Sequence, residues 1–238
     1  MNKTKVIGGL LAGAGVATVA GALWWRQQLK RPTETALLTN RDSLRQKEGW
    51  YFPSLQEELP MVVVIPEALV AGEAYSPWVS NLAKAGYPVF VLDSLLPSQA
   101  IKKAVAILRR FPHRSYVLVG HGRGGELVAT LANERLLTND ARLKGTIYLG
   151  ALPLYGENLQ SMALPALVVT GSQDKKTSGR ISFQEEQLYP TNTTFVSING
   201  GDHLGFASVC GHRPKALPAQ LQQKQLTEIL LQWLEQVE

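Results

Sequence analysis

The chain has 238 residues, of which 45% are hydrophobic and 18% charged, with a formal net charge of +5 and one cysteine. This length allows one large domain or two small ones, and the hydrophobic fraction supports a packed core rather than a disordered chain. A single cysteine excludes an intramolecular disulfide and a zinc site of the multi-cysteine kind. Residues 1–33 hold five basic side chains and no acidic one, which leaves 19 of each sign in the rest. Because the body of the chain is neutral, we expect no nucleic-acid partner.

The N-terminal segment has the pattern of a membrane anchor. Residues 6–25 lie between Lys5 and Arg26 without a charge, and Thr18 is their only polar side chain. As a helix, these 20 residues would span about 30 Å, the thickness of the hydrocarbon core of a bilayer. The pair Trp24-Trp25 stands at the end of the segment, where an interfacial aromatic belt would place it. We therefore predict an anchor, or an uncleaved signal, over residues 1–25.

Two alternatives remain for this segment, a removable signal peptide and a buried soluble helix. The stretch Ala20–Ala22 fits the small-x-small pattern of a signal cleavage site. Gly9 and Gly13 form a small-xxx-small pair that could pack two helices, and the oligomeric state stays open. A short basic N-terminal tail favours an extracytoplasmic body, whereas five basic residues after the segment favour the opposite orientation: Arg26, Lys30, Arg31, Arg41 and Arg45. We expect a single-pass membrane protein with an extracytoplasmic body.

The rest of the chain has the pattern of an α/β protein. Residues 26–59 are predicted to be a tether with early strands around Leu37 and at 49–52. After them, short aliphatic runs typical of strands buried on both faces of a parallel sheet occur at 62–65, 88–92, 116–120, 146–149, 167–170 and 194–198. Apolar residues at helical spacing occur at 73–86, 99–111, 125–137 and 217–237. The alternation predicts one doubly wound, mostly parallel α/β domain over residues 60–238, whose ligands bind beyond the carboxyl ends of the strands.

The strand at 116–120 ends in a glycine-rich turn that fits two motifs. As Gly120-His121-Gly122-Arg123-Gly124 it matches the nucleophile elbow G-x-S-x-G, with glycine at the serine position. Gly120, Gly122 and Gly125 also match the dinucleotide fingerprint G-x-G-x-x-G.

Two further strand ends favour the elbow. Asp174 follows the strand at 167–170, and His203 follows the strand at 194–198. Elbow, acid and histidine in this order are typical of an α/β-hydrolase triad. A dinucleotide site would need an acid at the tip of the next strand, which ends Leu149-Gly150-Ala151. Dinucleotide binding is therefore the minor alternative.

Three segments carry a resemblance to a known family. They are residues 65–75 together with 82–88, the elbow and its helix from Gly120, and the loop 200–206. From about residue 62 to residue 235 the chain resembles the small dienelactone-hydrolase-like group of α/β hydrolases, alpha/beta hydrolase family five. The resemblance implies cofactor-free hydrolysis of a small ester, lactone or related acyl substrate by a serine–histidine–aspartate relay. Asp174 would orient His203, and His203 would be the base.

The resemblance also implies an oxyanion hole. The backbone N–H of Arg123 would form it together with one from the loop 66–68, where Glu67 and Ala68 replace glycines that the family often has.

The chain departs from this family at Gly122, because glycine carries no atom that can attack a carbonyl carbon. We therefore predict that serine catalysis is lost and that the pocket is kept for binding or regulation through a small acyl ligand. The alternative is an active hydrolase that uses water activated by His203 and Asp174, or a nucleophile outside the elbow. Ser94 and Cys210 are the candidates for that role, and Cys210 is more typical of a small, partly buried residue. No metal motif or phosphate loop is evident, and we expect Gly122→Ser to restore cleavage of a small activated ester.

Overall fold

The computed structural model describes residues 28–56, 58–153, 159–177 and 181–237. The predicted anchor at 1–25 therefore lies outside the described residues. Within those ranges, the helices are all too short or too polar to cross a bilayer. The chain divides into residues 1–30 and 31–238, and the fold below is that of the second unit.

The described residues form an eight-stranded sheet with the order β1-β2-β4-β3-β5-β6-β7-β8. The strands are β1 Leu44–Arg45, β2 Gly49–Phe52, β3 Met61–Ile65, β4 Val89–Leu92, β5 Tyr116–His121, β6 Leu143–Leu149, β7 Ala166–Gly171 and β8 Thr193–Ile198. β2 pairs with both β1 and β4 in antiparallel fashion, and every other pairing is parallel. The sheet is thus mostly parallel, as the alternating pattern predicted.

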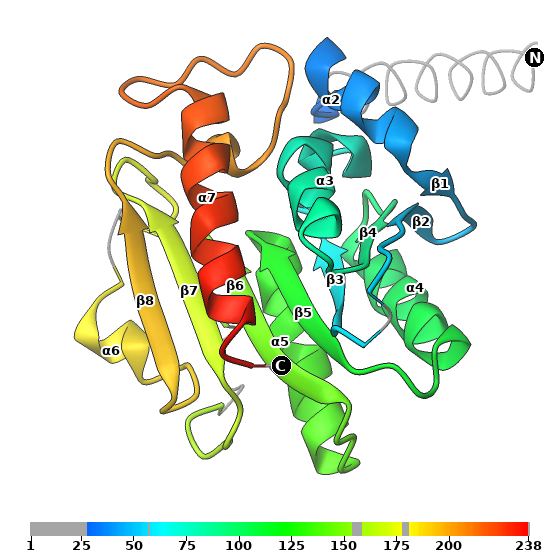
Figure 1. Ribbon diagram of the computed structural model, residues 1–238. Helices are drawn as coiled ribbons and strands as arrows, with labels where there is room; N and C mark the ends of the chain where they lie inside the picture. The colour runs from blue at the N-terminus through cyan, green and yellow to red at the C-terminus, as the bar shows by residue number, and fades with distance from the viewer. Residues whose placement is uncertain (1–27, 57, 154–158, 178–180, 238) are drawn as a thin grey trace, which may run out of the picture. The chain divides into compact units, whose positions relative to one another are not determined.

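Helices cover both faces of this sheet (Figure 1). α3 (Ser76–Lys84) and α7 (Ala219–Leu234) pack on one face, and α4 (Pro97–Arg110) and α5 (Arg123–Leu137) pack on the other. Along β3, Val62 and Val64 face α3 and α7, whereas Met61, Val63 and Ile65 face the opposite core. All five are buried, because successive side chains of a strand point alternately to the two faces of the sheet and both faces are covered. The remaining helices are short: α2 Glu34–Thr39, α6 Phe183–Glu186, and the 3₁₀ turns η1 Asn40–Asp42, η2 Gly72–Tyr75 and η3 Leu204–Phe206.

Two expectations about local structure were wrong. Leu37 lies in α2 rather than in a strand, because the Thr33 hydroxyl accepts a hydrogen bond from the Ala36 N–H (3.3 Å) and caps a helix there. β8, which was expected to be buried on both faces, is largely exposed. Within the described sheet it pairs with β7 alone and forms an edge, and its polar side chains Thr193, Thr194 and Ser197 suit that exposed position.

Residues 31–33, at the beginning of the second unit, are hydrogen-bonded to the loop between β8 and α7. Pro32 forms an isolated bridge with Val209, and the N–H of Thr33 donates to the carbonyl of Ser208 at 2.9 Å. The N–H of Cys210 donates to the carbonyl of Arg31 at 2.8 Å. The segment that follows residue 30 therefore lies against the same loop that carries His203.

Candidate functional site

The turn between β5 and α5 has the backbone of a nucleophile elbow. Gly122 lies between the end of β5 and the start of α5 and has a φ of +50°. This left-handed conformation suits glycine and costs about 1–3 kcal/mol for a residue with a side chain. A Cβ at position 122 would lie 1.9 Å from Oε2 of Glu67 and 3.0 Å from Nε2 of His203. The carboxylate of Glu67 thus occupies the place where a serine side chain would begin.

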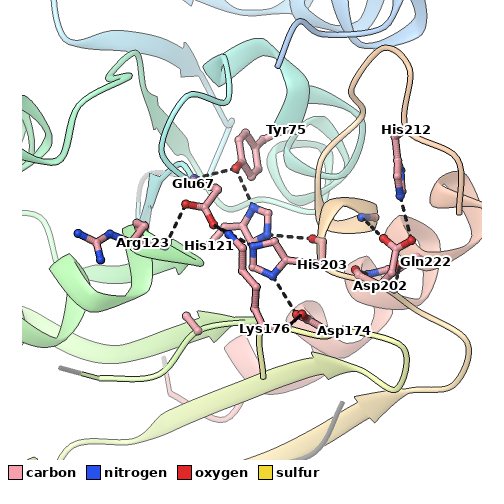
Figure 2. A network of polar contacts seen from close by, with 12 residues as sticks. Glu67, Tyr75, His121, Arg123, Asp174, Lys176, Asp202, His203, His212 and Gln222 are labelled. Atoms are coloured by element: carbon pink, nitrogen blue, oxygen red, sulfur yellow. Dashed lines mark hydrogen bonds and ion pairs between the residues drawn. The ribbon is translucent and has the colours of Figure 1, made fainter. Parts of the chain in front are cut away.

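The Glu67 carboxylate is held by four hydrogen bonds (Figure 2). Its Oε1 accepts from the backbone N–H of Ala68 (2.8 Å) and of Arg123 (3.3 Å). Its Oε2 accepts from Nε2 of His203 (2.8 Å) and from Nζ of Lys176 (2.7 Å). The N–H groups of Arg123 and Ala68, both named from sequence for an oxyanion hole, therefore converge on one oxygen. That oxygen is Oε1 of Glu67, a group of the protein itself. The backbone N–H of Glu67, also named for the oxyanion hole, donates to the Tyr75 hydroxyl (2.9 Å) and does not join the other two.

Asp174 and His203 are brought together as the triad order suggested. Asp174 lies in the turn after β7, and His203 precedes the 3₁₀ turn η3 that follows β8. Nδ1 of His203 lies 2.9 Å from Oδ2 of Asp174, and both side chains are buried. The other carboxylate oxygen of Asp174 accepts from the N–H of Lys176 at 2.8 Å. The acid and the histidine are thus placed as in a relay, with Glu67 where the relay would meet a nucleophile.

The position of His203 between two carboxylates sets its charge. Burial alone would lower the pKa of His203, but its hydrogen bonds to Asp174 and Glu67 outweigh burial and raise that pKa above its ordinary value. Burial likewise works to raise the pKa of Glu67, yet its bonds to His203 and Lys176 hold that pKa far below the usual range. Both ring nitrogens face carboxylate oxygens, which can only accept when ionised, so the geometry favours the imidazolium form, which donates both N–H groups. In that state it has no lone pair with which to take a proton from water or an alcohol.

A second series of buried hydrogen bonds fixes the loop that carries Glu67. The Tyr75 hydroxyl accepts from the N–H of Glu67 and donates to Nδ1 of His121 (2.9 Å), while Nε2 of His121 donates to the carbonyl of His203 (3.0 Å). Burial, reinforced by the charge on His203, lowers the pKa of His121 to about 3, so this ring is neutral. Leu69 in the same loop has a φ of +63°, a strained conformation for a bulky residue. The loop after β3 is therefore held in place by β5 and by the loop after β8.

Sequence reasoning missed four side chains of this network. It named Glu67 for its backbone alone, although an acid in a loop where the resembled family often has glycine was a usable signal. The roles of Tyr75, His121 and Lys176 depend on contacts between distant elements and had no local signal. Ser94, a candidate nucleophile outside the elbow, donates instead to the carbonyl of Leu96 (2.8 Å).

Cys210, also weighed as a nucleophile, was expected to be partly buried and is instead exposed. Its Sγ lies 3.2 Å from the carbonyl oxygen of Pro32, on the side where the chain enters the domain.

Two hollows flank the pair formed by Glu67 and Lys176. One, of about 280 Å³, lies over Gly122 and is bordered by Arg123, Glu126 and Leu152. The other, of about 270 Å³, lies beside His203 and is bordered by Lys175, His212, Arg213 and Lys215.

Comparison with known proteins identifies the family. A model of the alpha/beta hydrolase family matches residues 61–228, well over half of the chain. The chain belongs to the alpha/beta hydrolase family. This confirms the family suggested by the elbow, acid and histidine order, and it favours an elbow over a dinucleotide-binding turn at Gly120, Gly122 and Gly125. The search of curated protein sequences gave no match.

Solved structures share the fold at low sequence identity. A membrane phospholipase A described as a bacterial virulence factor is 11% identical, with a TM-score of 0.61 over 98% of this chain and 97% of its own. The monoacylglycerol lipase of Paleococcus ferrophilus is 14% identical, with a TM-score of 0.59 over 79% of this chain and 98% of its own. A thermophilic esterase from Thermogutta terrifontis is 13% identical, with a TM-score of 0.59 over 79% and 93% of the two chains. At these identities the likeness is one of fold.

Proposed function

We propose that this member of the alpha/beta hydrolase family has lost serine catalysis and uses its site to bind a ligand. The observation that carries the proposal is the Glu67 carboxylate beside Gly122. It takes the volume of the absent nucleophile, and it also accepts from both N–H groups that would stabilise an oxyanion. A substrate carbonyl would have to displace this carboxylate before it could reach either donor.

The charge state of the site speaks against catalysis by activated water. General-base catalysis needs an unprotonated histidine, and the hydrogen bonds to Asp174 and Glu67 raise the pKa of His203 and so favour its protonated form. Among the residues that the structure describes, it is Glu67 whose carboxylate stands at the nucleophile position. Both of its oxygens are engaged in hydrogen bonds and its pKa is strongly lowered, so it is a weak nucleophile. Binding is therefore the better supported of the two functions.

We further propose that the N-terminal segment anchors the chain in a membrane, with the body on the extracytoplasmic side, and that the ligand contains an acyl group. The uncharged run of residues 6–25 and its terminal tryptophans support the anchor. Several of the structural neighbours are described as lipases or esterases, which supports an acyl ligand. Protease protection of the full chain in sealed vesicles tests the orientation.

The proposal is tested on the purified full chain with p-nitrophenyl acetate and a fluorophosphonate probe. We expect no stoichiometric labelling and no hydrolysis above the rate of the His203→Ala variant, which serves as the matched control. Labelling of a serine, or hydrolysis that is lost in His203→Ala, would overturn the proposal. Acyl ligands are then sought by mass spectrometry of lipids that copurify with the protein.

A further inference from the structure

The hollow beside His203 has a strongly cationic border. Lys175, Lys176, Arg213 and Lys215 line it, together with the charged ring of His203. Its volume of about 270 Å³ is just below the range of about 300–1,000 Å³ that holds drug-sized ligands. The hollow therefore fits a small polar group, and its charge fits an anion.

The acids of this hollow are already engaged by other partners. Asp174 bonds His203, and Oδ2 of Asp202 lies 2.9 Å from Nε2 of His212 (Figure 2). The other oxygen of Asp202 accepts from the N–H of Gly205 at 2.8 Å, so the oxygens of both acids already have partners within the protein.

The basic side chains of the border are mostly unpaired. Lys176 is bonded to Glu67. Lys175, Arg213 and Lys215 are exposed and have no hydrogen bond or ion pair to any residue that the structure describes. Three basic side chains without a hydrogen-bonded partner among the described residues thus border one small hollow, and the basic residues of its lining outnumber the two acids, Asp174 and Asp202.

We infer that this hollow binds the phosphate monoester headgroup of a membrane lipid. A phosphate monoester carries a charge of about −1.5 to −2 at neutral pH, which matches the unpaired border better than a single carboxylate does. Arginine presents a planar fork of donors to phosphate oxygens, and lysine adds compact positive charges.

The attachment of the N-terminal segment favours a lipid over a free phosphate. This step rests on the proposed membrane anchor. Residues 26–31 can extend over at most about 20 Å, because a chain spans no more than about 3.6 Å per residue. Arg31 is hydrogen-bonded to Cys210, which lies two residues before His212 in the wall of the hollow. The loop that lines the hollow is therefore joined to the proposed anchor by a short stretch of chain, which favours a membrane lipid as the source of the phosphate.

The inference is tested with the full chain in phosphatidylcholine nanodiscs, with histidine-labelled protein observed by NMR. The probes are dihexanoyl phosphatidic acid, dihexanoyl phosphatidylcholine and inorganic phosphate. We expect dihexanoyl phosphatidic acid to shift the signals of His203 and His212 in a saturable way and to leave His113 unchanged. The variant Lys175→Gln/Arg213→Gln/Lys215→Gln should weaken this binding at least tenfold. The control Lys102→Gln/Arg109→Gln/Lys144→Gln removes the same charge from exposed positions outside the hollow and should change it less than twofold.

Each contrary outcome has a distinct meaning. Equal weakening in the two triple variants would overturn the assignment to this hollow. Inorganic phosphate binding as tightly as the lipid would overturn the lipid as its source. Phosphatidylcholine binding equally well would overturn the phosphate monoester. None of these results alters the fluorophosphonate and hydrolysis measurements, so failure here is distinguishable from failure of the proposed function.

Discussion

The two halves of the site differ in how far each keeps the arrangement of an acyl hydrolase. In one half, Asp174 and His203 form the hydrogen-bonded pair that such a relay requires. In the other half, the elbow carries Gly122, and the loop after β3 has placed a glutamate into the space. The difference teaches that a preserved acid and histidine do not make a preserved base. The same Nε2 that would take a proton from a serine here faces Oε2 of Glu67, and this second carboxylate helps to raise the pKa of the ring.

The presence of the Glu67 carboxylate in place of a serine side chain leaves few polar groups of the site without a hydrogen bond. An oxyanion hole without an occupant leaves two backbone N–H groups to water, and a buried histidine without a partner loses one hydrogen bond. Glu67 satisfies Ala68, Arg123 and His203 together. We infer that Gly122 and Glu67 act as one unit, since a side chain at position 122 and this carboxylate cannot occupy the same space.

The largest effect is expected from restoring the hydrolase half. Gly122→Ser alone should give no esterase activity, because its side chain would collide with Oε2 of Glu67. The expectation from sequence was that the single change is sufficient, and the activity of Gly122→Ser decides between the two predictions. Glu67→Ala/Gly122→Ser frees the two N–H donors and removes the partner that keeps His203 charged. We expect hydrolysis of p-nitrophenyl acetate at least about 100-fold above that of Gly122→Ser, within the range of about 10²–10⁴ that general-base assistance supplies.

The control for this pair of changes is Glu67→Ala alone, which opens the hole but provides no nucleophile and should stay inactive. Adding His203→Ala to the double variant should abolish the gain. If Gly122→Ser alone were as active as the double variant, Glu67 would not obstruct the elbow.

The sequence was sufficient for the part of the site that local patterns encode. Strand ends and chain order placed Gly122, Asp174 and His203 at one edge of the sheet, because the carboxyl ends of parallel strands meet there. The sequence could not show that the side chain of Glu67 turns towards the elbow, since that depends on Tyr75 and on contacts between β3, β5 and β7. For the same reason it could not show that His203 is charged. The exposure of β8 was missed because its β-branched residues were read as a buried strand, although Thr193, Thr194 and Ser197 are polar side chains that suit an exposed edge.

A smaller effect is expected when the charge of Glu67 is removed while its shape is kept. Glu67→Gln should lower the pKa of His203 towards and below its ordinary value, as measured by NMR titration. In the native chain the contribution of His203 to stability is present below pH 6.5 and is lost as pH rises through its raised pKa. The contribution of Glu67 is present above pH 4.5 and is lost as pH falls below that value.

The interaction of Glu67 with His203 should therefore contribute most to the free energy of unfolding of the native chain between about pH 4.5 and 6.5. Glu67→Gln should lack this contribution. The loss in free energy of unfolding at pH 6 should be about 1.5–3 kcal/mol, the usual worth of a hydrogen bond to a charged group. Urea unfolding from pH 4 to pH 9 measures it, with Glu228→Gln on the exposed side of α7 as the control. A parallel pH profile for native chain and variant would contradict the charged state of His203.

The smallest effect on stability is expected for a change at Lys176. This change tests whether Lys176 or His203 holds the Glu67 carboxylate at the elbow. The Lys176 side chain is 59% exposed although its Nζ lies 2.7 Å from Oε2 of Glu67, so water screens this ion pair. Exposed pairs of this kind contribute about 0–1 kcal/mol. Lys176→Gln should therefore reduce the free energy of unfolding by less than about 1 kcal/mol. It should also leave the NMR signal of His203 in its charged form at pH 6, because the bonds to Asp174 and Glu67 remain. Lys175→Gln, at the neighbouring exposed position, should change stability by no more than about 0.5 kcal/mol. A loss as large as that of Glu67→Gln would mean that Lys176, and not the acid–histidine half, keeps the carboxylate at the elbow.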